Sequence, residues 1–155
     1  MISNIFKSAV MALFLSLMSW AGVAADVTFP PGQVRIVTSS GAAHIFAVEL
    51  ALTGEARAQG LMNRTDLGPN QGMLFDFGQE REVTMWMRNT PLSLDMIFIQ
   101  ADWQVSHVAA NTTPFSEAII SSNGPVRYVL EVNAGRAAAL GIVPGSKATL
   151  ATAKN

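Results

Sequence analysis

The segment WMRNTPLSLDMIFIQ, residues 86–100, decides the fold of this chain. Its second part, residues 94–99, is apolar apart from Asp95, and six residues is the length of a strand rather than of a membrane span. Residues 89–91 read Asn-Thr-Pro, which is typical of a loop. The segment therefore predicts a junction between a strand and a loop that leads into a buried strand.

Short apolar or alternating segments lie on both sides of this strand and are separated by turn residues. They predict about seven strands and two short helices, and thus an α+β domain. The architecture that fits best is a β-rich, mostly antiparallel sheet or half-closed pseudo-barrel, capped by the helices. The predicted strands are 34–37 and 43–53, which form a hairpin, then 73–77, 82–88, 94–100, 104–110, 126–133 and 147–151; the predicted helices run from Thr53 to about Met62 and over 134–140.

Residues 111–125 are polar and rich in Ser and Thr. This composition predicts an exposed loop of unusual length, and long loops are more often functional or mobile than short ones.

The first 25 residues have the order of a secretory signal peptide. One cation precedes an apolar run over 9–17, and Val23-Ala24-Ala25 supplies small residues where a signal peptidase cleaves. Cleavage before Asp26 leaves a single globular domain, 26–155, with no further apolar stretch long enough to span a membrane. We therefore expect a periplasmic or secreted protein; the alternative is a segment kept as an N-terminal anchor.

Composition excludes several classes of function. The chain has no cysteine, so it has neither disulfides nor cysteine-based zinc sites. Removal of 1–25 takes away one basic residue and no acidic one, which changes 10 basic and 11 acidic residues to 9 and 11, a formal charge of −2. This balance argues against a nucleic-acid partner.

No metal or cofactor is predicted. His44 and His107 are far apart in sequence and have no metal-ligand spacing. Several methionines could suggest soft copper(I) ligands, but their spacing suits strand cores at least as well. These methionines are Met62, Met73, Met85, Met87 and Met96.

Several separate phrases of the chain form a pattern: residues 57–64, 72–75, 86–90 with 94–99, 128–131, Gly135 and 140–142. In this order and spacing they resemble the domain of unknown function 192 (DUF192) family, over about residues 46–150. The resemblance implies a small pseudo-barrel domain, often exported or membrane-attached in bacteria, with no established activity. Arg88 stands where the family commonly has Lys, a change that keeps the charge but alters the hydrogen-bond geometry.

The junction at residues 86–95 is the strongest candidate binding site. It presents an aromatic ring, a cation, an amide and a hydroxyl where a rigid sheet can position them. The expected occupant is a small polar or anionic ligand or an envelope protein partner. In the alternative, the turn closes itself through Asn89 and Thr90, while Trp86 belongs to the core. The candidate ligand-binding residues are Arg57, Arg64, Trp86, Arg88, Asn89 and Thr90.

Asp95 and Glu131 are the candidate catalytic residues. Asp95 shares a strand face with apolar residues, so its carboxylate needs a cation or several N–H donors. A structural ion pair or backbone clamp is the favoured interpretation of Asp95. If Asp95 and Glu131 faced one cleft, a cell-envelope hydrolase working by acid and base would be possible. A third hypothesis gives all these residues a structural role only.

Overall fold

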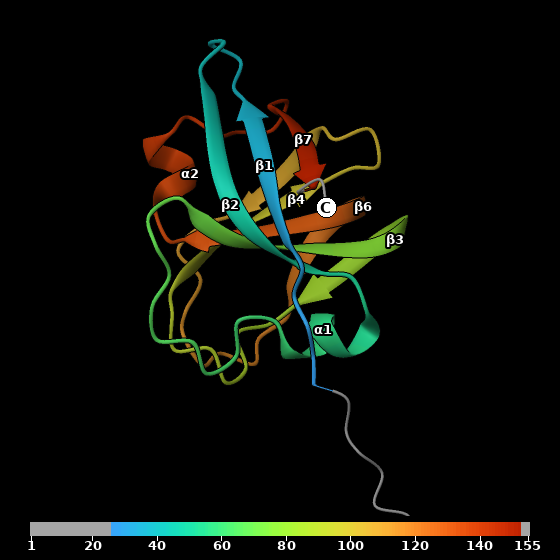
Figure 1. Cartoon of the computed structure of the whole chain (residues 1–155). Coiled ribbons are helices and arrows are strands. Elements are labelled where there is room, and N and C mark those ends of the chain that lie inside the picture. Colours follow the sequence, from blue (N-terminus) through green and yellow to red (C-terminus); the bar gives the residue numbers. More distant parts are fainter. Residues whose placement is uncertain (1–25, 153–155) are drawn as a thin grey trace, which may run out of the picture.

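The computed structural model describes residues 26–152, and within them the chain forms seven strands and two short helices (Figure 1). The expected signal peptide, 1–25, lies outside the described residues. The strands are β1 (Pro31–Val37), β2 (Ala43–Ala51), β3 (Gln71–Met85), β4 (Leu94–Ile99), β5 (Val105–Ala109), β6 (Ile120–Asn133) and β7 (Lys147–Thr152); the helices are α1 (Gly54–Gln59) and α2 (Arg136–Ala139).

All seven strands belong to one curled sheet in the order β5-β4-β6-β3-β2-β1-β7. Only the β2–β3 pair is parallel among these strands, and the other pairs are antiparallel. The two ends of the sheet meet, because the N–H of Val105 donates to the carbonyl of Ser146 at 2.9 Å and that of Ala148 to the carbonyl of Trp103 at 2.9 Å. The expected α+β half-barrel is confirmed.

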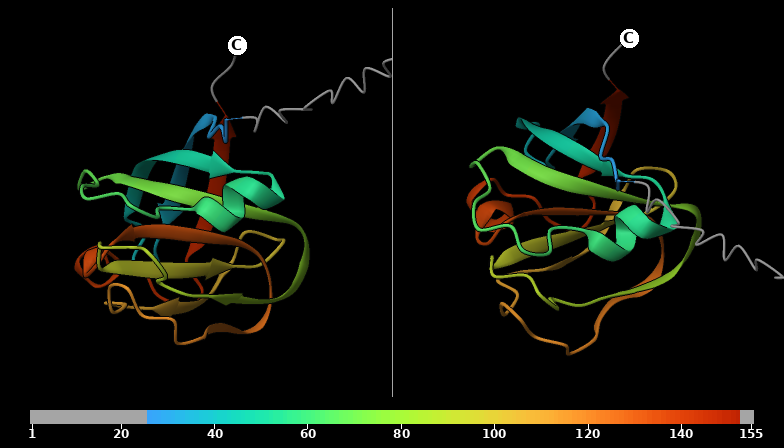
Figure 2. Two further views of the ribbon diagram at one scale, coloured as in Figure 1. Left: turned by 90° about the horizontal axis from the view of Figure 1, so that it is seen from below. Right: turned by 60° about the horizontal axis from the view of Figure 1, so that its bottom comes forward.

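The curled sheet has a hydrophobic core on each side. The inner core receives buried side chains from all seven strands, including Phe46, Ile97 and Leu130, and is closed at one end by α2. The outer core lies on the convex side of β3, β4 and β6, where α1 and the loops cover it, as Figure 2 shows from two directions. Because both faces of β4 are covered, all six of its residues are buried.

Local hydrogen bonds and backbone conformation explain where α1 begins and ends. The Thr53 hydroxyl accepts the Ala56 N–H at 3.1 Å and caps α1, as the sequence indicates. The helix ends at Gln59, before the predicted Met62, because Gly60 adopts a φ of 49° and its N–H returns to the carbonyl of Ala56.

Two predictions for the middle of the sheet were wrong. The segments 73–77 and 82–85 are parts of one strand, β3, in which Gly78 takes a φ of 78° and the pairing register shifts between Asp76 and Arg81. Residues 86–88, predicted to continue the second strand, lie beyond its end at Met85. This irregularity bends the strand without ending it. The expected loop 111–125 is also too long, since β6 begins at Ile120 and pairs with the far end of β3.

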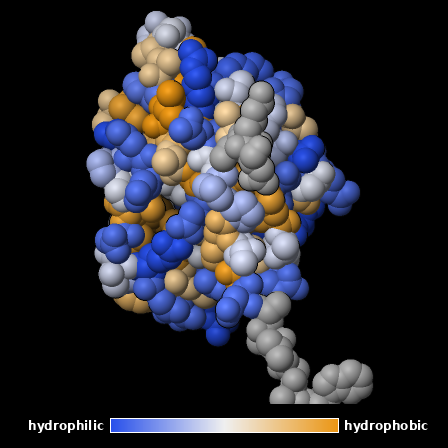
Figure 3. Space-filling view, in the orientation of Figure 1, coloured by the Kyte–Doolittle hydropathy of each residue, from blue (hydrophilic) through white to orange (hydrophobic). Residues whose placement is uncertain are grey.

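Among the described residues, no helix has both the length and the apolar character that crossing a membrane requires. The face shown in Figure 3 carries mainly hydrophilic residues with hydrophobic ones scattered among them.

Candidate functional site

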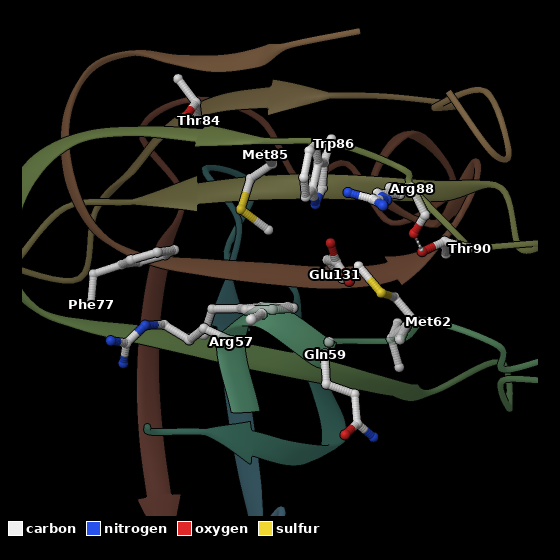
Figure 4. Close-up of a pocket in the computed structure, with 14 residues that line it drawn as sticks. Arg57, Gln59, Met62, Phe77, Thr84, Met85, Trp86, Arg88, Thr90 and Glu131 are labelled. Carbon is white, nitrogen blue, oxygen red and sulfur yellow. Dashed lines mark hydrogen bonds between the residues drawn. The ribbon is translucent and has the colours of Figure 1, made fainter. Parts of the chain in front are cut away.

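A pocket of about 190 Å³ opens on the convex side of the sheet, between α1 and the segment that follows β3. Its lower wall comes from α1 and the turn after it, its upper wall from the end of β3 and the residues beyond, and its floor from β6 (Figure 4). The lining consists of residues 57–62, Phe75, Phe77, 84–86, Arg88, Thr90 and Glu131.

Glu131 provides the polar group at the floor of the pocket. Its side chain is on the face of β6 that also carries Val129 in the outer core, and the residue is only 4 % exposed. Figure 4 shows the carboxyl group between Trp86, Arg88 and Met62. No described group donates a hydrogen bond to it, and burial alone raises the pKa of Glu131 to about 8. The group is therefore mainly uncharged at neutral pH.

Trp86 forms part of the upper wall and is 43 % exposed. The interpretation of Trp86 as a core residue is therefore wrong. The ring lies 5.4 Å from the guanidinium carbon of Arg88, a distance at which a cation interacts with an aromatic face. An exposed indole beside a buried carboxyl group is an arrangement typical of ligand pockets.

Arg88 and Thr90 line the pocket, while Asn89 does not. The three residues belong to a tight turn in which the Thr90 N–H donates to the carbonyl of Met87 at 3.1 Å and Asn89 takes a φ of 53°. The carbonyl of Asn89 accepts the N–H of Asn63 at 2.8 Å, which ties the turn to the segment after α1. Asn89 therefore shapes the site from outside it.

Arg57 lies along the edge of the pocket with its charged group already engaged. One guanidinium nitrogen donates to the carbonyls of Leu52 at 2.9 Å and Asp76 at 2.8 Å. The guanidinium carbon lies 5.5 Å from the centre of the Phe77 ring. In Figure 4 the side chain extends toward Phe77 and away from Glu131.

Arg64 is not part of this pocket, contrary to the sequence-based prediction. Its guanidinium binds the Glu49 carboxylate at 2.6 Å. Both residues line a neighbouring hollow of about 210 Å³, which shares Leu61 with the pocket. The turn after α1 directs the side chain of Arg64 toward β2, away from Trp86.

Asp95 is fully buried and held by backbone donors. The N–H groups of Asn111, Gly135 and Ala137 donate to its two oxygens at 2.9, 3.1 and 2.9 Å. This arrangement is the backbone clamp that the sequence favoured for Asp95. A carboxylate that accepts three hydrogen bonds fixes the start of α2 and the loop after β5 to β4.

The structure does not bring Asp95 and Glu131 into one cleft. In the β4–β6 pairing, Asp95 lies opposite Val132 and Met96 lies opposite Glu131. Because neighbouring side chains of a strand point to opposite faces, the two carboxyl groups are on opposite sides of the sheet. The acid–base pair of the hydrolase hypothesis is therefore not formed.

Sequence reasoning missed most of the apolar lining of the pocket, which includes Phe75, Phe77, Met62 and Met85. The alternation of β3 could have placed Phe75 and Phe77 on one face, but not over Glu131. The other methionines of the copper(I) alternative, Met73, Met87 and Met96, are buried in the outer core. The described residues contain no cluster of three His, Cys, Asp or Glu side chains that could hold a metal ion.

Fold and pocket together define a small half-barrel domain with a polar pocket on its convex side. The chain belongs to the DUF192 family, described as uncharacterized ACR, whose model matches residues 35–150.

Two solved structures are similar to the chain over most of its length. A protein from Sinorhizobium meliloti 1021, described as a proposed transcription regulator, is 48 % identical with a TM-score of 0.78, and the match covers 80 % of this chain and 96 % of that one. A protein of unknown function from Novosphingobium aromaticivorans DSM 12444 is 42 % identical with a TM-score of 0.75, covering 82 % and 94 %. No curated protein matches the chain at a significant level.

Proposed function

We propose that this domain is a non-catalytic binding module for a small polar ligand, which it holds in the pocket beneath Trp86. One observation carries the proposal: the buried carboxyl group of Glu131 points into the pocket and receives no hydrogen bond from any described residue.

A buried polar group without a partner destabilises a fold, by about 1–3 kcal/mol for a typical group. Asp95 shows that this domain can surround a buried carboxylate with donors. An unpartnered carboxyl group in a pocket is a candidate functional group, because its polar atoms are available to a ligand.

The rim of the pocket favours a ligand with some negative charge. Arg57 and Arg88 both line it, and Arg88 has a side chain that is 52 % exposed. An arginine in this position can bind a carboxylate or phosphate group through two parallel hydrogen bonds. The cationic and aromatic residues expected from the sequence thus remain the core of the proposed site, with Glu131 added and Arg64 removed.

The name given to the relative from S. meliloti suggests a second class of partner, nucleic acid. The formal charge of −1 for the whole chain provides no excess of cations to bind phosphates. The two helices of residues 26–152 have six and four residues, too few for a recognition helix of the usual kind. A small ligand therefore explains the structure better than nucleic acid.

The alternative function, a cell-envelope hydrolase, is supported by one observation only. A carboxyl group with a pKa of about 8 is a suitable general acid near neutral pH, and Glu131 has this property. Its proposed partner, Asp95, lies on the other face of the sheet with its oxygens occupied. Binding without catalysis is therefore the better-supported function.

We propose further that the domain acts in the periplasm or outside the cell, after removal of residues 1–25. The supporting observation is the signal-like order of those residues. Mass spectrometry of the intact protein, expressed from the full chain in a bacterial host, tests whether residues 1–25 are removed. A mass equal to that of residues 26–155 supports export with cleavage before Asp26. A mass equal to that of the full chain in the soluble fraction contradicts the proposal.

The ligand proposal is tested by a thermal-shift screen of sugars, nucleotides, organic acids, amino acids and metals. Saturation to a hundred times the dissociation constant adds about 2.7 kcal/mol to the free energy of unfolding, which shifts the melting temperature by several degrees. Wild type is compared with Trp86→Ala and with Ile45→Ala, which removes an exposed side chain of β2 outside the pocket.

A shift that Trp86→Ala loses and Ile45→Ala keeps supports the pocket. A shift that both variants keep places the ligand elsewhere and contradicts the proposal. If no compound class shifts any of the three proteins, the structural hypothesis is favoured instead.

A further inference from the structure

Building on the proposed binding function, we propose that the ligand is a small zwitterion of the amino-acid class. Its ammonium group sits on the Glu131 carboxylate at the floor of the pocket, and its carboxylate reaches Arg88 at the rim.

The inner part of the pocket is suited to a cation. When ionised, the Glu131 carboxylate only accepts hydrogen bonds, so the complementary group is one that only donates them, and an ammonium group has three N–H donors and no acceptor. The walls beside Glu131 carry the indole of Trp86 and the ring of Phe75. Aromatic faces attract ammonium groups, and their attraction is stronger where water is excluded.

The other polar side chains near the floor are poor alternatives to Glu131. The Thr90 hydroxyl donates to the carbonyl of Arg88 at 3.1 Å. The guanidinium of Arg57 binds two carbonyls and extends away from the floor (Figure 4). Glu131 is therefore the group that a buried polar part of the ligand would contact.

Arg88 provides the second anchor. Its nearest charged neighbour is the exposed Glu117, whose oxygen lies 3.6 Å from Nε, too far for a hydrogen bond of normal length. The exposed guanidinium, which also lies against the Trp86 ring, can exchange this long ion pair for a ligand carboxylate. Figure 4 places it on the same side of the pocket as the Glu131 carboxyl group. A ligand with opposite charges at its two ends matches these two residues.

The volume of about 190 Å³ limits the size of the ligand. Pockets for drug-sized molecules have about 300–1,000 Å³, so this one suits a smaller molecule. The apolar lining from Leu61, Met62 and Met85 can contact an aliphatic side chain. These features fit a single amino acid better than a peptide or a nucleotide.

Protons are exchanged on binding. The free domain holds Glu131 mainly protonated below its pKa of about 8, and an ammonium ligand requires the ionised form. The charged residues that line the pocket around Glu131 are Arg57 from α1 and Arg88 from the turn; β3 and β4 place Met73 and Met96 opposite it. Binding therefore releases a proton, and the affinity rises by about tenfold per pH unit until about pH 8.

The first experiment screens the twenty standard L-amino acids one by one by thermal shift, with protein expressed from the full chain. The one that binds most tightly is then measured by calorimetry as the free amino acid, as its N-acetyl form and as its amide. Acetylation removes the ammonium charge, and amidation removes the carboxylate. We expect each change to weaken binding by at least about tenfold, the size of one lost charged contact.

Two variants test which residue contacts which end of the ligand. Glu131→Gln should lower the affinity for the free amino acid about tenfold or more and leave the affinity for the N-acetyl form unchanged. It should also abolish the pH dependence of the affinity. Arg88→Ala should weaken the free amino acid but not its amide. Glu49→Gln and Arg64→Ala are the matched controls, because they change the same residue types in the neighbouring hollow. Both should bind like wild type.

The inference and the proposed function can fail separately. If sugars or organic acids bind in the pocket and no amino acid does, the binding function stands and the zwitterion inference is wrong. An N-acetyl form that binds as tightly as the free amino acid also overturns the inference. If no compound class binds, both are wrong.

Discussion

Asp95 and Glu131 are two buried carboxyl groups on neighbouring strands, and their surroundings differ completely. Asp95 faces the end of the inner core and accepts three backbone hydrogen bonds. Glu131 faces the outer pocket and accepts none from the described residues, so burial raises its pKa to about 8. The same sheet thus satisfies one carboxylate with backbone donors and leaves the other without a hydrogen bond from the described residues.

This difference separates a carboxyl group that holds the fold together from the one at the centre of the proposed site. The Asp95 clamp connects β4, the loop after β5 and the start of α2, segments that are distant in sequence. Glu131 connects no elements, and its carboxyl group contributes nothing to the fold that the structure shows. Substitutions at the two positions should therefore affect stability with opposite signs.

The largest effect is expected for Asp95→Ala. It leaves three N–H groups without their acceptor, of which the one from Ala137 is buried and the other two are part-buried, and we expect it to lower the free energy of unfolding by about 3–5 kcal/mol. Urea denaturation measures the change, with Asp102→Ala as the control at an exposed carboxylate. A loss below about 1 kcal/mol would show that water or a backbone shift replaces the clamp.

Glu131→Gln should stabilise the domain at high pH. The pKa of Glu131 in the folded state, about 8, lies above its ordinary value of 4.5. The folded state therefore keeps a proton that the unfolded state loses, so wild-type stability falls as the pH rises from about 4.5 to about 8 and is constant above.

Glutamine does not ionise and so removes this loss. The free energy of unfolding of the variant should therefore exceed that of wild type by about 2–4 kcal/mol at pH 9 and equal it at pH 4. Melting curves across this pH range test the expectation, with Glu49→Gln as the control. Parallel curves for wild type and Glu131→Gln would mean that Glu131 is not buried as an acid in the folded protein.

Thr112→Val tests the loop that delivers one donor to Asp95. The buried Thr112 hydroxyl donates to the carbonyl of Leu94 at 2.9 Å and accepts a hydrogen bond from the N–H of Leu94 at 3.1 Å. We expect its loss to cost about 1–2 kcal/mol, measured by urea denaturation. Thr113→Val, at the exposed neighbour, should be neutral. Equal effects for both variants would mean that the Thr112 hydroxyl does not hold this loop to β4.

The smallest effect is expected for Trp86→Ala. Since Trp86 is 43 % exposed, its loss should change stability by about 1 kcal/mol or less. Trp103 is the matched control because its ring stacks on Tyr128 with 4.0 Å between centroids, and Trp103→Ala should cost about 3 kcal/mol. If thermal melting shows equal losses for the two, Trp86 is a structural residue and not part of a binding site.

Much of this organisation was predictable from the sequence. The alternation of Phe46, Val48 and Leu50 gives one face of β2, and the apolar run after Asp95 gives β4, because these signals depend only on local spacing. The join of two predicted strands into β3 was not predictable, since Gly78 breaks a strand pattern in the same way whether the chain turns or only bulges.

The candidate site was predicted in part. Trp86, Arg88 and Thr90 lie within five residues of one another, at the end of β3 and in the turn after it, so proximity in sequence brings them together. The positions of Arg64 outside the pocket and of Glu131 on the face opposite Asp95 were not predictable, because both depend on how α1 and β6 pack against the rest of the sheet. No local pattern contains that information.

The sequence by itself therefore determined the class of fold, the membership in the DUF192 family and the residues of the turn after β3. Only the tertiary structure decided that Asp95 and Glu131 lie on opposite faces, one clamped and one free. The physical reason is that strand pairing sets the register between β4 and β6, and a shift of one residue would exchange the faces of every side chain. Register is a property of contacts between distant segments, and it places the Glu131 side chain on the face of the sheet where the pocket lies.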